Sequence, residues 1–317
     1  MTARRLHVFH PRPEALVAAV AEAAPDAEVV SLRTEEELLG CFGEVENLLA
    51  MRPPRRHWGK ARRLRLLQMV GVGVDSVLPA RDLHERVRIA NASGIAATAL
   101  AEFALSLILA LEKQLPRAVR QQDAKRWRPW VPRRLEGQTV AILGLGAIGR
   151  ALAERLVPLG VRVVGTRRSG RGGPEGVVAQ VLPPVSTAEA LRQATIAVVL
   201  LPKTAQTQNL LDGAMLDQMP EGARLVHLAR GGIVDEEAVL ERLESGRIGG
   251  AAFDVFVEEP LPDTSPFWAQ DRLLVTPHTS GFFAEYAQDL ARLFVDNVER
   301  MERGEEPRNV VDRERGY

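Results

Sequence analysis

Short runs of apolar residues alternate with amphipathic segments from one end of the chain to the other. The runs predict strands over Leu6–Phe9, Glu28–Ser31, Asn47–Ala50, Leu64–Met69, Thr139–Leu143, Arg162–Gly165, Ile196–Leu200, Leu225–Leu228, Ala251–Val255 and Leu273–Val275. Apolar residues at helical spacing predict helices over Pro13–Ala24, Thr34–Cys41, Ala147–Leu159, Ala188–Ala194 and Glu236–Glu244. Strands that alternate with helices are typical of βαβ units, so the pattern predicts an α/β fold with parallel sheets.

Two longer helices divide this pattern. Ala97–Lys113 and Ala284–Glu302 each carry apolar residues along one side. Four of the predicted strands precede the first of these helices and the others lie between the two, so we expect the first four to form a separate sheet. Residues 170–176 and the Pro183-Pro184 pair predict loops inside the second set of strands.

Composition and charge narrow the classes of function. The 317 residues and their 46% hydrophobic content suit two domains with buried cores. Lys and Arg together number 41, as do Asp and Glu, so no overall field favours nucleic acid or an anionic membrane. The chain has one cysteine, Cys41, no Cys-x-x-Cys metal motif, no signal-peptide pattern and no apolar run of membrane-spanning length. We therefore expect a cytoplasmic protein without a metal site.

A glycine-rich loop follows the strand predicted at Thr139–Leu143. The loop, Gly144-Leu-Gly146-Ala147-Ile148-Gly149, opens a predicted helix, and a further strand closes the unit. Gly144 allows the tight turn, Gly146 lets the backbone approach a pyrophosphate, and Gly149 lets the helix pack closely on the strand. The start of the helix offers free N–H groups to phosphates, so the segment predicts a dinucleotide site.

The residues after the second strand of this unit bear on the choice of coenzyme. NAD sites usually have Asp or Glu there for the ribose 2′-hydroxyl, whereas this chain has Thr166-Arg167-Arg168-Ser169. Arginine suits a 2′-phosphate, because it forms charge-assisted and often bidentate hydrogen bonds. We therefore expect NADP(H) to be preferred and NAD(H) to be possible. The alternative is that both arginines are solvated surface charges on a NAD enzyme.

Three charged segments follow predicted strands in the C-terminal half, where parallel sheets border their ligands. They contain Arg230 in an Ala-Arg-Gly-Gly sequence, Glu259 directly before Pro260, and His278 after Thr276-Pro277. Arg230 could bind the carboxylate of a 2-keto acid, His278 could protonate its carbonyl oxygen as hydride arrives, and Glu259 could hold the imidazole. Taken singly, each has an ordinary alternative: Arg230 could form a turn salt bridge, His278 could be a capping residue and Glu259 could be a surface charge.

These segments together resemble the D-isomer-specific 2-hydroxyacid dehydrogenases, and the resemblance covers nearly the whole chain. It extends to Gly71-Val-Gly-Val-Asp75, Asn91-Ala-Ser-Gly94 with Ala101-Glu102, and Leu201-Pro202-Lys-Thr204. The resemblance implies that Arg230 binds the substrate carboxylate, that His278 is the acid/base and that Glu259 pairs with His278.

The resemblance also implies the other residues of the site. Asp254 would contact the nicotinamide amide, and the backbone of Val70-Gly71-Val72 would also receive the carboxylate. The cofactor would further contact Leu201, Pro202, Leu228 and Ala229.

The resemblance implies a layout of two doubly wound parallel-sheet domains. A Rossmann nucleotide domain, residues 96–283, would be inserted into a flavodoxin-like substrate domain built from residues 1–95 and 284–317. We expect a homodimer formed through the nucleotide domains, with a small 2-keto or 2-hydroxy acid as its other partner.

Two departures leave alternatives open. His227 stands where the family usually has Asn, and its strand position favours a packing role over chemistry. The Trp127-Arg-Pro-Trp130-Val-Pro stretch resembles glyoxylate/hydroxypyruvate reductases, in which a Trp can approach the partner's site, but the two Trp could equally anchor an interdomain connection. A reductase of glyoxylate or hydroxypyruvate is the expected function; the alternatives are a dehydrogenase for a bulkier 2-hydroxy acid and a nucleotide-sensing corepressor.

Overall fold

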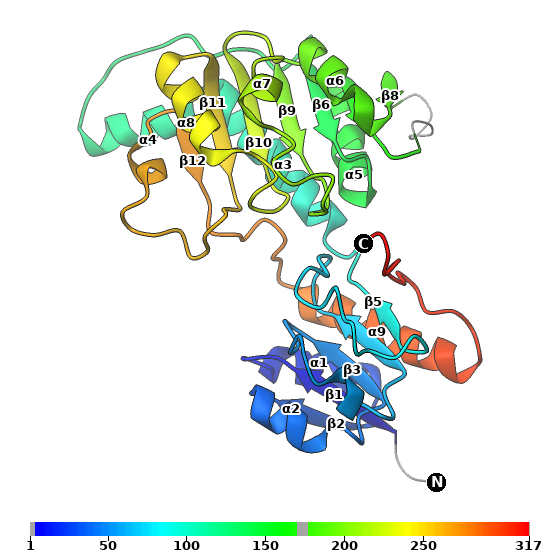
Figure 1. The fold of residues 1–317 in the computed structure, drawn as a ribbon. Coiled ribbons are helices and arrows are strands. Elements are labelled where there is room, and N and C mark those ends of the chain that lie inside the picture. Colours follow the sequence, from blue (N-terminus) through cyan, green and yellow to red (C-terminus); the bar gives the residue numbers. More distant parts are fainter. Residues whose placement is uncertain (1–3, 170–176, 317) are drawn as a thin grey trace. The chain divides into compact units, whose positions relative to one another are not determined.

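The computed structural model describes residues 4–169 and 177–316. The chain divides into two compact units, one of Met1–Ala96 with Phe283–Tyr317 and one of Ala97–Phe282 (Figure 1). The first unit is therefore built from both ends of the chain, and the second is continuous in sequence. None of the helices in the described residues has the length and apolar character needed to cross a membrane.

The first unit contains one parallel sheet with the strand order β2-β1-β3-β4-β5. Its strands are β1 (Arg5–Phe9), β2 (Glu28–Leu32), β3 (Asn47–Ala50), β4 (Leu66–Met69) and β5 (Arg88–Ala90). Its helices are α1 (Glu14–Ala23), α2 (Glu35–Cys41), the short 3₁₀ helix Trp58–Lys60 and α9 (Tyr286–Glu302). This strand order is that of flavodoxin-like sheets.

Both faces of this sheet are covered. Successive side chains of a strand point to opposite faces, so each strand contributes to two apolar clusters. Leu6, Val8 and Leu49 pack in one buried cluster with residues of α1 and α9. Leu48 and Ala50 pack in another cluster with residues of α2 and the 3₁₀ helix. Burial on both faces explains why the inner strands β1, β3 and β4 consist mainly of apolar residues.

The second unit contains a parallel sheet with the order β12-β11-β10-β9-β6-β7-β8. Its strands are β6 (Thr139–Leu143), β7 (Arg162–Thr166), β8 (Gln180–Leu182), β9 (Ile196–Val199), β10 (Ala223–His227), β11 (Ile248–Phe253) and β12 (Leu273–Val275). Its α-helices are α3 (Ala97–Lys113), α4 (Leu115–Asp123), α5 (Ala147–Leu156), α6 (Thr187–Gln193), α7 (Gly213–Leu216) and α8 (Glu236–Ser245). The order reverses between β6 and β9, which is the switch point where doubly wound sheets bind ligands.

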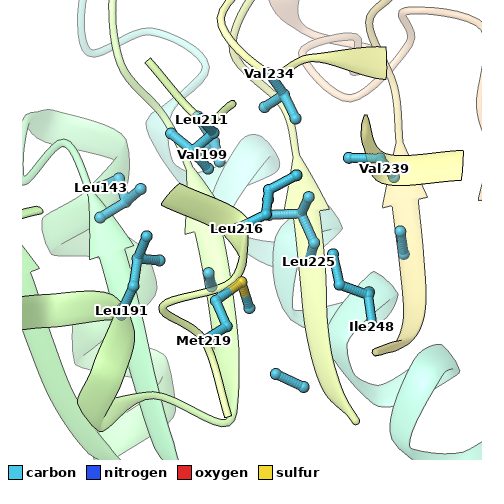
Figure 2. Close-up of a cluster of buried hydrophobic side chains, with 14 of the residues drawn as sticks. Leu143, Leu191, Val199, Leu211, Leu216, Met219, Leu225, Val234, Val239 and Ile248 are labelled. Carbon is cyan, nitrogen blue, oxygen red and sulfur yellow. The ribbon is translucent and has the colours of Figure 1, made fainter. Parts of the chain in front are cut away.

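Two apolar clusters cover the faces of this second sheet. The cluster in Figure 2 joins Leu143, Val199 and Leu225 of the strands to Leu191 of α6 and Val239 of α8. The other face packs against residues of α3 and α5. The sheet is therefore buried on both sides, and the carboxyl ends of its strands are held in a rigid framework.

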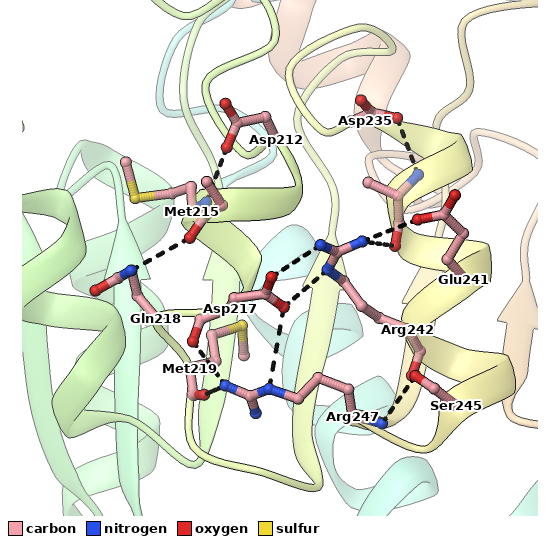
Figure 3. A network of polar contacts seen from close by, with 12 residues as sticks. Asp212, Met215, Asp217, Gln218, Met219, Asp235, Glu241, Arg242, Ser245 and Arg247 are labelled. Carbon is pink, nitrogen blue, oxygen red and sulfur yellow. Dashed lines mark hydrogen bonds and ion pairs between the residues drawn. The ribbon is translucent and has the colours of Figure 1, made fainter.

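Polar contacts fix helix α8, which follows the segment that carries Arg230 (Figure 3). Asp235 accepts a hydrogen bond from the backbone N–H of Ala238 at the start of α8. Arg242 of α8 donates two hydrogen bonds of 2.9 Å to the carboxylate of Asp217, which lies at the end of α7. The Arg242 guanidinium lowers the pKa of the Asp217 carboxyl below its usual value.

The structure corrects several predictions from the sequence. The first sheet has five strands rather than four, because β5 was missed, and β8 was missed in the second. Helices α4 and α7 were also missed, and Pro184 begins a short 3₁₀ helix, Pro184–Ser186, where a loop was predicted. Both missed strands have only three residues, too few to produce an alternating or continuous apolar run. The loop predicted at 170–176 lies outside the described residues.

Candidate active site

The glycine-rich loop leads from β6 into α5, as the sequence predicts. Gly144 has a φ of 108°, and a Cβ there would lie 2.8 Å from the carbonyl oxygen of Leu200. A Cβ at Gly149 would lie 2.4 Å from the carbonyl oxygen of Gly144, so only glycine lets α5 approach the strand so closely. These two positions are therefore fixed by the turn and by helix–strand packing.

Gly146 differs from the other two glycines, because it faces open space. It caps α5 without a side chain, and no atom of the described chain lies within 4 Å of where its Cβ would be. The first N–H groups of a helix lack partners within the helix, and those of α5 begin at Ala147 and Ile148. This arrangement fits a dinucleotide pyrophosphate, because a bare helix start next to an uncovered glycine can accept an anion at close range.

The segment after β7 lies beside this loop. The carbonyl oxygen of Thr166 accepts hydrogen bonds from the N–H groups of Gly144 and Leu145, so the end of β7 and the glycine loop are joined directly. Arg167 is half-buried, whereas Arg168 and Ser169 are exposed. Two cationic side chains thus follow the strand at which the adenosine ribose binds in this type of fold.

Arg230 lies in the loop between β10 and α8. Leu228 and Ala229, which precede it, are buried, and its Nη1 donates to the carbonyl oxygen of Ala229 at 2.7 Å. A Cβ at Gly231 would lie 1.9 Å from the carbonyl oxygen of Phe256. The Arg230 loop is thus packed directly on the loop that carries Glu259.

His278 and Glu259 form a hydrogen-bonded pair. Nδ1 of His278 lies 2.7 Å from Oε2 of Glu259, and Oε1 of Glu259 accepts a hydrogen bond from the N–H of Phe256. The side chains are 42% and 28% exposed, so the pair remains open to a ligand. With Nδ1 held by the carboxylate, the imidazole can present Nε2 as a proton donor or acceptor.

Asp254, at the end of β11, holds the turn that carries His278. Its buried carboxylate accepts hydrogen bonds from the hydroxyl of Thr276 and from the N–H groups of Thr279 and Ser280. Its carbonyl oxygen accepts from the N–H of His278, whose φ of 50° is in the left-handed region. The structure therefore assigns Asp254 a role in shaping this turn that sequence reasoning missed, and the contact with nicotinamide remains a prediction.

Within the second unit, the structure brings the remaining predicted residues to the same edge of the sheet. Leu201 and Pro202 follow β9, Arg230 follows β10, and Glu259 and His278 follow β11 and β12. These strands are parallel, so their carboxyl ends all lie on the same edge of the sheet, the edge on which doubly wound folds bind their ligands. The glycine pair at 231–232 was the one signal in the sequence that could have indicated the close packing at Gly231.

The Val70-Gly71-Val72 segment follows β4 in the first unit. The carbonyl oxygens of these residues accept hydrogen bonds from the Tyr286 hydroxyl, the N–H of Ala92 and the side-chain amide of Asn91, respectively. Within the described residues, none of the hydrogen bonds uses the N–H of Gly71 or Val72. The segment is thus anchored through its carbonyl groups, and these two N–H groups are available to an anion.

Comparison with known proteins identifies relatives over the whole length. The family model for the NAD binding domain of D-isomer specific 2-hydroxyacid dehydrogenases matches residues 105–280. A glyoxylate/hydroxypyruvate reductase A from Salmonella paratyphi C is 32% identical over 320 residues, which cover 98% of this chain and 98% of the relative. A protein of the same name from Klebsiella pneumoniae (strain 342) is 32% identical over 265 residues, covering 81% of this chain and 83% of the relative.

Solved structures share this architecture. A D-isomer specific 2-hydroxyacid dehydrogenase from Xanthobacter autotrophicus Py2, in complex with NADPH and MES, has a TM-score of 0.88 and 32% identity and covers 99% of this chain and 100% of its own. An NADPH-dependent glyoxylate/hydroxypyruvate reductase from Sinorhizobium meliloti, in complex with NADP and sulfate, has a TM-score of 0.89 and 27% identity over the same shares. These matches confirm the predicted fold class and the family resemblance: this chain belongs to the D-isomer specific 2-hydroxyacid dehydrogenase family.

Proposed function

We propose that this protein reduces a small 2-keto acid, of the size of glyoxylate or hydroxypyruvate, to the D-2-hydroxy acid with NADPH as the preferred coenzyme. The observation that carries this proposal is the 2.7 Å contact between His278 and Glu259 at the edge of a sheet that also bears the glycine-rich loop. Relatives at 32% identity are named glyoxylate/hydroxypyruvate reductases, which supports the substrate class.

Arg230 binds the substrate carboxylate in this proposal. A guanidinium binds a carboxylate through two parallel hydrogen bonds. These bonds raise the affinity for the substrate and also fix the orientation of its carbonyl group, next to the carboxylate. The N–H groups of Gly71 and Val72 are the further donors for the same carboxylate.

His278 supplies the proton that the reduction consumes. Reduction of the carbonyl group adds one hydride to carbon, which the bound nicotinamide provides, and one proton to oxygen. His278 donates that proton from Nε2 and keeps its Nδ1–H on Glu259 throughout, so the ring neither rotates nor changes its partner. Glu259 also fixes the orientation of the imidazole, because its carboxylate is in direct contact with Nδ1.

The coenzyme preference rests on Arg167 and Arg168, with the exposed Ser169 as a neutral donor, whereas Thr166, the last residue of β7, is buried. No carboxylate is present in this tetrapeptide to bind a ribose 2′-hydroxyl, and the two guanidinium groups suit a 2′-phosphate. The Xanthobacter and Sinorhizobium structures contain NADPH and NADP, respectively, which supports the same preference. NADH remains a usable, weaker coenzyme in this proposal.

The domain roles and the assembly belong to the same proposal. The unit of Ala97–Phe282 binds the dinucleotide, and the unit of Met1–Ala96 with Phe283–Tyr317 contributes to the substrate site. Every residue of α4 is at least partly exposed, and Trp127 beyond it is 96% exposed. The exposed apolar side chains of Leu115, Val119 and Trp127 favour a homodimer formed through the nucleotide-binding units, which light scattering after gel filtration measures. A cytoplasmic location suits the lone Cys41.

Steady-state kinetics with a panel of 2-keto acids test the proposal. Glyoxylate, hydroxypyruvate and bulkier acids are each assayed with NADPH and with NADH. We expect turnover of the two small acids and a higher kcat/KM with NADPH. The matched variants are Glu259→Gln, expected to lower kcat, and Glu258→Gln, the neighbouring exposed carboxylate, expected to leave it unchanged. Absence of turnover with every acid and both coenzymes refutes the proposal.

A further inference from the structure

His227 is a polar side chain buried at the carboxyl end of an inner, apolar strand. It is the last residue of β10, is 1% exposed and packs edge-on against Phe253 of the neighbouring strand, with ring centroids 5.1 Å apart. Its neighbours in the strand, Leu225 and Val226, are fully buried hydrophobic residues. An apolar residue could occupy this position with a smaller desolvation cost. The presence of an imidazole here therefore indicates that its polar atoms have a function.

That reason is a hydrogen bond to the backbone of Arg230. Nε2 of His227 lies 3.0 Å from the carbonyl oxygen of Arg230. A carbonyl oxygen can only accept, so Nε2 carries the proton and Nδ1 carries the lone pair. Nδ1 has no hydrogen-bond partner within the described residues. The ring thus leaves one buried nitrogen unsatisfied while it holds the Arg230 carbonyl with the other.

We propose that His227 is a positioning residue for Arg230: its imidazole N–H holds the Arg230 carbonyl, so that the guanidinium is presented to the substrate carboxylate. This inference rests on the proposed function. It assigns to a strand residue a part in substrate affinity, where the position alone indicates packing.

The packing of the loop explains why one backbone contact matters. The Arg230 carbonyl oxygen also accepts a long hydrogen bond of 3.4 Å from the N–H of Ile233. On its other side, Gly231 lies against the backbone of Phe256. The guanidinium of Arg230 is itself bonded to the backbone of its own loop at Ala229, so a shift of that backbone moves the guanidinium with it.

The hydrogen bond holds at every working pH. Burial lowers the pKa of His227 to about 3, so the ring is neutral and keeps the same tautomer from mildly acidic to basic conditions. The Asp254 carboxylate and the carbonyl of Arg230 oppose this shift without overcoming it. Any pH dependence of turnover in the neutral range therefore arises from groups other than His227.

The test compares three substitutions of His227. His227→Phe keeps the ring and removes the donor, and His227→Met removes the donor with a flexible side chain, in case Phe is not accommodated. His227→Asn keeps an N–H donor and is the residue usual in the family. We expect KM for the 2-keto acid to rise about ten-fold in the variants without a donor, the fold-change of one net hydrogen bond. We expect His227→Asn to stay within about three-fold of the wild type, and NADPH affinity, measured by fluorescence titration, to change less than two-fold.

His7→Phe is the matched control. His7 is also a buried imidazole in a parallel strand, and its Nδ1 likewise has no hydrogen-bond partner within the described residues, but it lies in the first unit. We expect this variant to keep the wild-type KM. A double variant with Arg230→Lys provides a second readout, because a residue that acts through Arg230 has little further effect once the guanidinium is gone.

The outcomes separate this inference from the proposed function. An unchanged KM in both His227→Phe and His227→Met overturns it, as does a His227→Asn variant that is impaired as strongly as they are, since packing alone then explains the residue. An equal loss of NADPH affinity also overturns it, because the effect is then general. If the wild type turns over no 2-keto acid, the proposed function fails and the inference fails with it.

Discussion

Replacing Gly231 by alanine perturbs the contact between the two loops that carry Arg230 and Glu259. Gly231 has no positive φ, so alanine is compatible with its backbone conformation and the effect is purely steric. The added Cβ would lie 1.9 Å from the carbonyl oxygen of Phe256, 2.2 Å from its carbon and 2.5 Å from the nitrogen of Val257. All three are backbone atoms, so no side chain can rotate away to make room.

The structure sets the size of the displacement. Real Cβ atoms are essentially never closer than 3.0 Å to such neighbours, so the loops must separate by at least about 1.1 Å. A misplacement of about 1 Å among catalytic groups can cost on the order of 100-fold in rate. Because the displacement parts Arg230 from the loop of Glu259, we expect kcat/KM for the 2-keto acid to fall about 100-fold.

Steady-state kinetics on Gly231→Ala measure this loss, with circular dichroism and NADPH titration to show that the variant is folded and binds its coenzyme. Gly40→Ala is the control, because Gly40 lies in helix α2 with nothing within 4 Å of its added Cβ. That variant should keep full activity and gain up to about 1 kcal/mol of stability from helix propensity. A Gly231→Ala enzyme within two-fold of the wild type would refute the steric reasoning.

Four further outcomes follow from the site. His278→Ala should lower kcat by roughly 10²–10⁴, the usual contribution of a general acid, and a variant with wild-type kcat would remove His278 from the chemistry. Arg230→Lys should raise KM and lower kcat on glyoxylate, because a point charge replaces a bidentate fork; full kcat/KM would place the carboxylate elsewhere. Arg167→Asp should reverse the preference of kcat/KM for NADPH over NADH, and a wild type that prefers NADH contradicts the assignment. Burial lowers the pKa of His227 from 6.5 to about 3, so between these two pH values His227 is protonated in the unfolded chain and neutral in the folded chain. The free energy of unfolding therefore keeps its full value above pH 6.5 and falls by about 1.4 kcal/mol per pH unit as the pH drops toward 3. Hydrogen exchange of β10 peptides at pH 7 and pH 5 should show this extra loss in the wild type and not in His227→Asn.

The sequence predicted the parts of the fold that depend on local pattern. The strand at Thr139–Leu143 and the helix at Ala97–Lys113 were predicted with their observed bounds, since long apolar runs and sustained helical spacing carry that information. Strand β5 could not be predicted, because three residues form it only by pairing with β4, and an isolated bridge joins Ala90 to Val310, far away in sequence. Helix α4 was missed because every residue in it is at least partly exposed, which leaves no buried face to read.

The candidate site, like the fold, could be predicted from the sequence only in part. The pairing of Glu259 with His278 was expected from the resemblance, and the structure places their side chains in contact. The hydrogen bonds of Asp254 to the turn after β12 were not predictable, because they join residues 22 to 26 positions apart through tertiary packing. His227 was noticed only as a departure from the family, since nothing in the sequence shows which backbone carbonyl its ring reaches.

The discontinuity of the first unit has a consequence for the newly made chain. Helix α1 packs against α9 in one apolar cluster, yet α9 begins at Tyr286, 263 positions after α1 ends at Ala23. At translation rates of about 5–20 residues per second, α9 is synthesised on the order of 10–50 s after α1. The second unit, being continuous, can fold on the ribosome during that interval. The apolar face of α1 and its sheet is then the surface that nascent-chain chaperones would cover until α9 emerges.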